Sequence, residues 1–359
     1  MADKTKIEWT EATWNPITGC SVTSPGCASC YAMLLAGTRL AGHPSRAGLT
    51  RDTKAGPVWT GEVRLNEGWL AQPLKWKRPR MIFVCAHADL FHENVPDAWI
   101  DRVFAVMALA PQHTFQVLTK RSPRMRAYMN DPATRDRIDA VMDEIAPAHW
   151  HTRELEDFGS WPLPHVWLGV STEDQRRADE RVPDLLATPA AVRWVSAEPL
   201  IEAVDFERIT VRVPGEPGGF HHYVNALTGG VYDDENGTID GAYGDAPSPR
   251  LAWVVVGGES GRGARAMHPQ WARDIRDQCD RSGTAFFFKQ WGLIAPLAGA
   301  LPVNLAPPPG SLVAWPDGTV GGGSAAENGG EGVALFRAAK SLVGRLLDGV
   351  DHSAMPGPV

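Results

Sequence analysis

Six short runs of hydrophobic and β-branched residues recur along the chain, and polar residues interrupt them little. The runs cover residues 81–86, 114–118, 165–170, 192–196, 251–256 and 284–288. Continuous runs of this length are typical of strands that are buried on both faces of a parallel sheet. Helical spacing of apolar residues predicts helices between the runs, at 98–109, 182–187 and 271–282, and Gly283 marks the end of the last one.

Strands that alternate with helices predict βαβ units and therefore a parallel sheet. With one more strand near Cys20, the pattern predicts an α/β fold in which the sheet closes into a partial parallel (β/α) barrel. Polar residues follow each predicted strand, and in such a barrel they gather at the carboxyl ends of the strands. We therefore expect a shared functional face there.

Two loop-rich stretches divide the chain. We predict the barrel over residues 1–294, with an insertion at about 202–250 that is rich in Gly, Pro, Asp and His and forms a small hairpin or a lid. Residues 295–359 are predicted to be a Pro/Gly-rich extension with a helix at 333–347.

Composition adds to this prediction only the general class of protein and its net charge. Hydrophobic residues make up 43% and charged residues 21%, as in a soluble globular protein. Neither an apolar run of about 18 residues nor a secretory signal is evident, so we expect a cytoplasmic protein without membrane contact. The net charge of −7 argues against coating of nucleic acid by bulk electrostatics, but it permits a local basic patch.

The cysteines carry the strongest chemical signal. Three of the five, Cys20, Cys27 and Cys30, lie within eleven residues in the spacing C-x6-C-x2-C. Three thiolates can bind three irons of a [4Fe–4S] cluster and leave the fourth iron open. An open iron can chelate the amino and carboxylate groups of S-adenosylmethionine, and an electron from the cluster then yields a 5′-deoxyadenosyl radical.

Two other hypotheses remain open. Structural zinc needs four protein ligands, and His43, Cys85 or His87 can supply the fourth, which gives a zinc-stabilised nucleic-acid-binding module without radical chemistry. Alternatively, the cysteines only stabilise the N-terminal segment of a barrel enzyme, and other residues catalyse its reaction.

The sequence resembles a phage- and prophage-associated group of radical-SAM-like proteins, largely of unknown function. The resemblance covers most of the chain. It rests on residues 13–32 around the cysteines, DLFHE at 89–93, LTKR at 118–121, VWLGVSTED at 166–174, SAEPL at 196–200, the GGESGRGARAMHPQW segment that ends at Trp271, and FFFKQWG at 286–292. More distantly, the TGC before a CxxCY segment and a later TK pair are similar to the spore photoproduct lyase family, which repairs a thymine dimer in DNA.

The resemblance implies a barrel of the radical SAM type, with a [4Fe–4S] cluster and S-adenosylmethionine as cofactors. It also implies an electron donor such as flavodoxin or ferredoxin, and a nucleic-acid or nucleotide substrate, such as DNA, for repair or base modification. Tyr31 follows the third cysteine, and Glu259 in the sequence GGE matches a contact to the methionyl amine that is usual after an earlier strand in the radical SAM enzymes.

Further candidates follow the predicted strands. Lys120 and Arg121 can pair with a cofactor carboxylate or a substrate phosphate, and Lys120 is also a catalytic candidate. Ser171, Thr172 and Glu198 can bind the ribose, carboxylate or adenosine, and Gly257, Gly258 and Glu259 can bring the backbone close to the cofactor.

Cys85, at the end of a strand, is either a core residue or a hydrogen-atom donor. Asp89, His92 and Glu93 are expected to form a polar wall of the site. Two basic segments, 75–80 with Trp76 and 120–126, are candidates for contact with a phosphate backbone, and Trp76 can stack on a base. An ordinary solvated basic loop is the alternative.

Overall fold

The structure is a computed structural model of the 359-residue chain. It describes residues 5–146, 161–212, 221–233, 237–238, 248–261, 263–296, 312–315, 317–322, 333–337 and 344–357.

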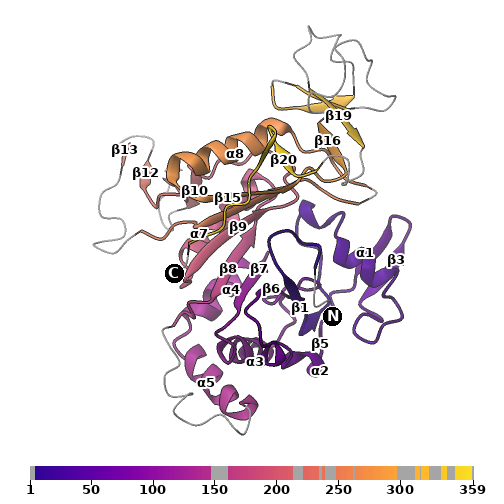
Figure 1. Cartoon of the computed structure of the whole chain (residues 1–359), viewed down its shortest axis with the longest axis vertical. Coiled ribbons are helices and arrows are strands. Elements are labelled where there is room, and N and C mark those ends of the chain that lie inside the picture. The colour runs from indigo at the N-terminus through magenta and orange to yellow at the C-terminus, as the bar shows by residue number, and fades with distance from the viewer. Residues whose placement is uncertain are drawn as a thin grey trace. The chain divides into compact units, whose positions relative to one another are not determined.

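Seven strands form one parallel sheet in the order β1-β6-β7-β8-β9-β14-β15 (Figure 1). Their bounds are β1 Ala12–Trp14, β6 Met81–Val84, β7 Thr114–Thr119, β8 Val166–Ser171, β9 Val192–Ala197, β14 Trp253–Gly257 and β15 Ala285–Gln290. All six apolar runs are therefore strands, and the seventh strand lies just before Cys20. The strand order follows the chain order, as in a (β/α) barrel. The predicted parallel α/β architecture is confirmed at this level.

The chain divides into two compact units. The first consists of Met1–Val170 with Asp184–Arg193 and the last two residues, and the second of Ser171–Pro183 with Trp194–Gly357.

In the first unit, α3 (Asp97–Ala108), as predicted, packs against α5 (Thr134–Ile145), which the sequence analysis missed (Figure 1). The core beneath these helices contains the fully buried Trp14, Phe104 and Phe115. The second basic segment, 120–126, for which a solvated loop was the alternative to phosphate contact, runs into a helix, α4 (Ser122–Asn130). Pro123 in its first turn suits a helix start, because a proline there sacrifices no helical hydrogen bond.

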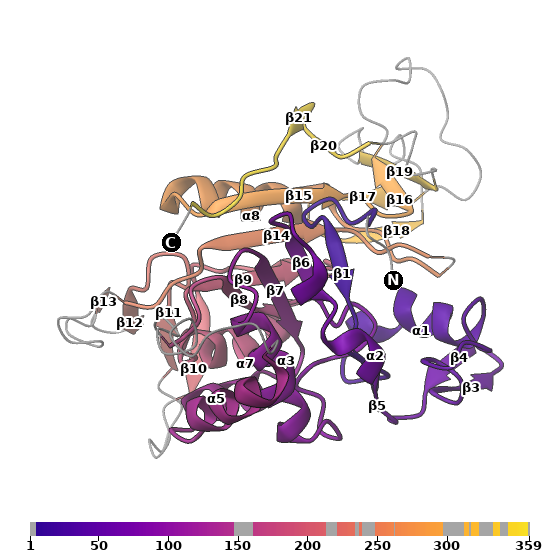
Figure 2. The same cartoon turned by 60° about the horizontal axis from the view of Figure 1, so that its bottom comes forward.

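Small elements surround the cysteines in the same unit. They are β2 (Ile17–Thr18), which pairs with β5 (Arg64–Leu65), the hairpin of β3 (Thr50–Thr53) and β4 (Gly56–Trp59), and the helices η1 (Pro25–Cys27), α1 (Tyr31–Gly37), α2 (Glu67–Leu70) and η2 (Pro73–Lys75). The β3–β4 hairpin packs on α1 (Figure 2). Trp59 and Met33 are buried together at this contact.

In the second unit, α8 (Pro269–Ser282) packs on β14 and β15. It ends at Gly283, which has a left-handed backbone conformation, as predicted. The helix predicted at 182–187 is the end of a longer one, α7 (Gln175–Leu186). The described part of the 202–250 insertion forms a four-stranded antiparallel sheet of β10 (Ile209–Arg212), β11 (His221–Val224), β12 (Val231–Asp233) and β13 (Gly237–Thr238).

The prediction of a C-terminal helix at 333–347 is wrong for the residues of this segment that the structure describes. Val333–Arg337 is strand β19, which pairs with β16 (Ile294–Pro296) and β17 (Leu312–Ala314), and β18 (Val320–Gly322) completes that sheet. The physical reason is the pairing of this segment with β16 and β17, which no local pattern indicates, since Leu335 alone of its five residues is buried. The chain then forms β20 (Leu346–Leu347) and β21 (Val350–Asp351). Residues 338–343 lie outside the described residues.

The described helices are too short or too polar to cross a membrane.

A buried hydrogen bond ties α3 to α4 and gives a test of the fold. The Tyr128 hydroxyl donates to a carboxylate oxygen of Asp101 at 2.7 Å, and both side chains are almost fully buried. We expect Tyr128→Phe to lower the free energy of unfolding by about 2 kcal/mol, because the carboxylate loses a charge-assisted hydrogen bond. Denaturant titration measures this value.

Tyr232→Phe is the matched control. The Tyr232 hydroxyl donates to the uncharged backbone oxygen of Glu207 at 2.7 Å in a half-buried position. Its loss should cost less than about 1 kcal/mol. Equal losses in the two variants would show that the buried Tyr128–Asp101 bond does not stabilise the helices.

Candidate active site

The cysteine loop leaves the sheet at the carboxyl end of β1. The N–H of Gly19 donates to the backbone oxygen of His87 at 3.2 Å, which fastens the loop to the segment that follows β6. Gly19 has a positive φ of 98°, and a Cβ there would collide with the backbone oxygen of Glu62. Only glycine fits this position, so the glycine before Cys20 fixes the entry to the loop.

Each of the three sulfurs is surrounded by hydrogen-bond donors. The Arg121 guanidinium donates to Sγ of Cys20 at 3.5 Å. The hydroxyls of Thr23 and Ser24 lie 3.9 and 3.8 Å from Sγ of Cys27. The Trp59 indole and the first backbone N–H groups of α1 act on Cys30. Donors of this kind stabilise a thiolate and are typical of iron–sulfur ligands.

Burial and neighbouring charge act differently on the three thiols. Burial raises the pKa of Cys20 to about 12, although Arg121 opposes the shift, and burial also raises the pKa of Cys30. For Cys27, burial is outweighed by Lys120 together with hydrogen bonds from Thr23 and Ser24, so its pKa is lowered. Cys27 raises the pKa of both other thiols, and Cys30 raises that of Cys20, because like charges repel.

Asp89 joins the strand ends around this loop. Its carboxylate accepts from the Thr119 hydroxyl at 2.6 Å, the Lys120 N–H at 2.9 Å, the Phe91 N–H at 3.0 Å and Arg121 at 3.2 Å. Nearly all its acceptor capacity is therefore used to hold the loops after β6 and β7 together. The residues around it form the polar wall of the cysteine loop.

His92 and Glu93 belong to the same wall. Nε2 of His92 lies 3.0 Å from the Ser21 hydroxyl and 3.3 Å from the Glu93 carboxylate. Within the described ranges, no three histidine, cysteine or carboxylate side chains form a ready site for a single metal ion.

Cys85 directly follows β6 and has an unusual backbone conformation. Its φ is +56°, which costs energy for a residue with a side chain, and its N–H donates to the backbone oxygen of Trp14 at 2.7 Å. Burial raises the thiol pKa to about 12, so the sulfur keeps its proton at neutral pH.

Tyr31, the first residue of α1, is linked to the same segment. Its hydroxyl donates to the backbone oxygen of Ala86 at 2.6 Å, and its ring meets the His87 ring edge-on at 5.9 Å. About half of the Tyr31 side chain remains exposed, as do Val22 and Leu34 nearby in sequence. The residues around Cys30 thus present an apolar surface to solvent.

The remaining candidates belong to the second unit. Ser171 and Thr172 are buried, and the hydroxyl of Thr172 has no hydrogen-bond partner among the described residues. Arg181 donates to the backbone oxygen of Ser171 at 2.8 Å and pairs with the fully buried Glu173 at 2.9 Å. An orphaned buried hydroxyl beside an ordered ion pair is a plausible place for a ligand oxygen.

Glu198 and the glycine pair lie together. Lys289 pairs with the Glu198 carboxylate at 2.8 Å, and a Cβ on Gly257 would collide with that carboxylate. A Cβ on Gly258 would collide with the backbone oxygen of Trp291. Close packing within the protein therefore accounts for both glycines.

Glu259 is occupied by a neighbour. Its carboxylate accepts from the backbone N–H of Arg265 at 2.8 Å and from the Arg265 guanidinium at 2.6 and 2.8 Å. A methionyl amine would have to displace this bidentate pair. The local role of Glu259 is to close the loop after β14.

The two basic segments differ from expectation. Trp76 is buried, with Arg80 stacked over its ring at 4.8 Å, so this indole is not an exposed platform for a base. Within 120–126, Arg121, Arg124 and Arg126 pair with Asp89, Asp97 and Asp184, and the segment runs into α4. Of these residues, the exposed cations without a described acidic partner are Lys75, Lys77 and Arg78.

Sequence reasoning missed Ser21, Trp59 and Arg181. Ser21 follows the first cysteine directly, and that proximity was a usable signal. Trp59 lies 29 residues after Cys30 and reaches it only because the β3–β4 hairpin folds back on α1. No local pattern predicts that contact.

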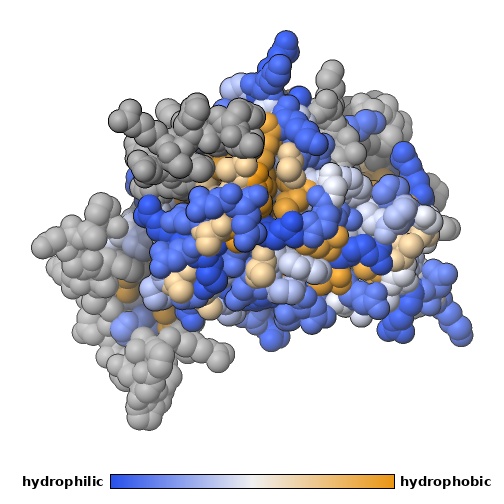
Figure 3. All heavy atoms as spheres, turned by 90° about the horizontal axis from the view of Figure 1, so that it is seen from below, coloured by the Kyte–Doolittle hydropathy of each residue, from blue (hydrophilic) through white to orange (hydrophobic). Residues whose placement is uncertain are grey.

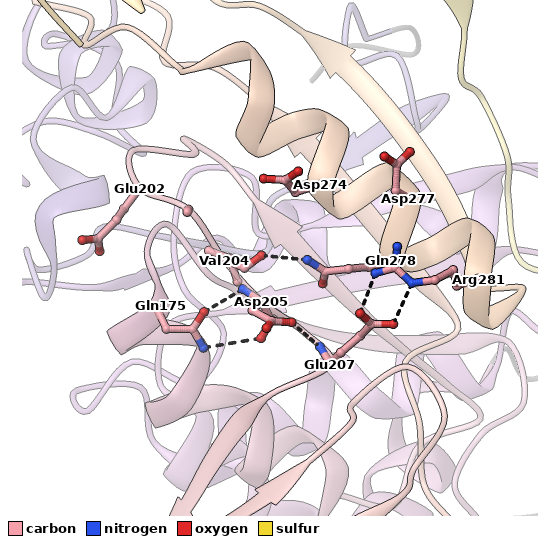
Figure 4. A pocket seen from close by; sticks show the side chains of 10 residues that line it. Gln175, Glu202, Val204, Asp205, Glu207, Asp274, Asp277, Gln278 and Arg281 are labelled. Carbon is pink, nitrogen blue, oxygen red and sulfur yellow. Dashed lines mark hydrogen bonds and ion pairs between the residues drawn. The ribbon is translucent and has the colours of Figure 1, made fainter. Parts of the chain in front are cut away.

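The second unit also carries a surface pocket of about 560 Å³ (Figure 4). Acidic side chains dominate its wall, and two lining residues are engaged as follows. Glu207 pairs with Arg281 at 2.6 Å, and Gln278 bonds the backbone of Val204 and Phe206. The face drawn in Figure 3 is mainly hydrophilic, with hydrophobic residues gathered in limited patches.

His87 gives a pH test of the site's local environment. Burial and the nearby Arg46 lower its pKa from 6.5 to about 4, and its Nδ1 has no described partner. Below pH 6.5 His87 is protonated in the unfolded chain, whereas in the folded chain it stays neutral until about pH 4. Stability therefore falls across this window, by at most about 3 kcal/mol in total.

His87→Phe keeps a ring beside Tyr31 and removes the titration. Denaturant titrations at pH 7 and 4.5 should show a smaller loss of stability for the variant than for the wild type. Identical losses in the two proteins would rule out a depressed pKa for His87.

Comparison with known proteins gives one result. No curated protein and no solved structure matches the chain. The profile of one family, described as a protein of unknown function (DUF5131), matches residues 4–356 and so nearly the whole chain. The chain therefore belongs to the DUF5131 family of proteins of unknown function.

Proposed function

We propose that this protein is a radical S-adenosylmethionine enzyme that holds a [4Fe–4S] cluster on Cys20, Cys27 and Cys30. The observation that carries the proposal is the set of donors around the three sulfurs. Three thiols crowd into one loop, and each has at least one N–H or O–H group directed at it. This donor set fits thiolate ligands of an iron–sulfur cluster.

The surrounding charges support the same proposal. Three thiolates would add three negative charges to one loop, and burial of the sulfurs alone disfavours each charge. Arg121 and Lys120 come from the end of β7 and act on Cys20 and Cys27 respectively. The positive charges of Arg121 and Lys120 therefore offset the negative charge of the thiolate ligands.

The sheet supports the placement. The cysteine loop follows β1, and the segments that hold it follow β6 and β7, so all three leave the same carboxyl edge of parallel strands. Active sites of (β/α) barrels lie at that edge. Cys20, Cys27 and Cys30 would hold the cluster, and the cluster would supply the electron needed for reductive cleavage of a carbon–sulfur bond of the cofactor.

We further propose roles for single residues. Cys85 keeps a protonated thiol in a strained position, which suits a hydrogen-atom donor. Ser171, Thr172 and Glu198 are candidate contacts for the ribose and carboxylate of the cofactor. The orphaned hydroxyl of Thr172 is the observation that favours this group.

Incorporation of the cluster tests the proposal. We expect anaerobic reconstitution to give about four irons and four sulfides per wild-type chain, as a [4Fe–4S] cluster requires. Cys27→Ala should lose the cluster and cofactor cleavage while far-UV circular dichroism stays unchanged. Iron and sulfide analysis with absorption spectroscopy measures the first effect.

Cys279→Ala is the control, because Cys279 is a buried residue of α8. It should keep the full iron and sulfide content. Tightly held zinc in the wild type, or unchanged iron in Cys27→Ala, would contradict the assignment.

We propose a nucleic-acid or nucleotide substrate on two grounds. One is the similarity to the spore photoproduct lyase family, and the other is the exposed cluster of Lys75, Lys77 and Arg78. This cluster precedes β6 and therefore lies at the amino end of the strand, whereas the cysteine loop leaves the carboxyl end of the parallel β1. It would hold the phosphate backbone and not the reacting base.

Replacement of Lys75, Lys77 and Arg78 by alanine tests that contact. If all three side chains contact phosphates, the magnitude of the slope of log affinity against log salt for single-stranded DNA should decrease by about 2. The reason is that binding releases fewer counterions when three phosphate contacts are missing. Fluorescence anisotropy at several salt concentrations measures the slope. Lys54→Ala, at another exposed basic position, should leave it unchanged, and an unchanged slope in the triple variant would exclude this contact.

A further inference from the structure

Arg121 is fixed more completely than a ligand-binding arginine needs to be. It follows β7, precedes α4, and its side chain is only 6% exposed. A guanidinium has five N–H donors, and here five donor contacts are made within the protein. The side chain therefore has no N–H group left over for a cofactor carboxylate.

Two carboxylates set its position. Nε donates to Glu93 at 3.3 Å, and one terminal nitrogen donates to Asp89 at 3.2 Å. Asp89 is itself held by Thr119 and by backbone N–H groups. The two carboxylates, which the fold holds in place, thus fix the orientation of the planar guanidinium.

The two terminal nitrogens of Arg121 also donate hydrogen bonds to the cysteine loop. The nitrogen that bonds Asp89 also donates to Sγ of Cys20 at 3.5 Å. The other terminal nitrogen donates to the backbone oxygen and the hydroxyl of Ser21 at 3.2 and 2.7 Å. One side chain therefore fixes both the first cysteine and the residue that follows it.

We propose that Arg121 is a positioning residue that donates a hydrogen bond to the Cys20 thiolate and raises the reduction potential of the cluster. The inference rests on the proposed function, and it assigns Arg121 to the cluster and not to the cofactor. Reduction adds an electron to a group that is already negative, so a fixed cation at a ligand sulfur favours the reduced state.

A potential titration tests this role. Wild type and Arg121→Met are reconstituted anaerobically, and the reduced cluster signal is followed by electron paramagnetic resonance as the potential is lowered. We expect both proteins to bind the cluster and the variant to have a more negative midpoint potential. A merely structural role would change cluster content but not the potential of the clusters that form.

Arg126→Met is the matched control, because it removes the same charge from α4, which Arg121 directly precedes. Arg126 is half exposed and pairs with Asp184. Its midpoint potential should equal that of the wild type. An equal shift in both variants would show that total charge, and not the contact with Cys20, sets the potential, and would overturn the inference.

A second measurement needs no variant and covers failure of Arg121→Met to fold. Wild-type protein labelled with ¹⁵N-arginine should show a ¹⁵N coupling to the reduced cluster in pulsed paramagnetic resonance. A bound cluster without this coupling would overturn the inference and leave the proposed function intact. A wild-type protein that binds no cluster would overturn the proposed function itself.

Discussion

A cluster on Cys20, Cys27 and Cys30 would require three thiolates in one loop, and the proposed site depends on how their negative charge is stabilised. Burial opposes ionisation at Cys20, Cys27 and Cys30, and the sulfurs oppose one another. A folded chain accepts such a loop only if donors and cations surround it, or if a metal takes up the charge. Arg121 and Lys120 supply the cations, both from the end of β7.

The same constraint explains the polar residues around the loop. Arg121 needs fixed acceptors, and Asp89 needs fixed donors, so the ends of β6 and β7 are tied to each other as well as to the cysteines. Burial raises the pKa of Cys85, which directly follows β6, to about 12, the same value as for Cys20. What differs between the two thiols is the contact of Cys20 with Arg121.

The strands and the cysteine loop could be predicted from the sequence, because both signals are local. A continuous apolar run indicates a buried strand, and three cysteines in eleven residues indicate shared chemistry. The partners of the sulfurs could not be predicted, since Trp59 reaches Cys30 through a hairpin that folds back. The roles of Arg121 and Glu259 depend on which neighbours they meet, and the strand at Val333–Arg337 depends on pairing with β16 and β17.

The central claim is that three cysteines hold a cluster with one open iron. The most direct test is the paramagnetic resonance spectrum of the reconstituted, reduced protein with and without S-adenosylmethionine. The account predicts a [4Fe–4S]⁺ signal whose g values change when the cofactor is added. A signal that the cofactor leaves unchanged, or a protein that takes up zinc and no iron, would contradict it.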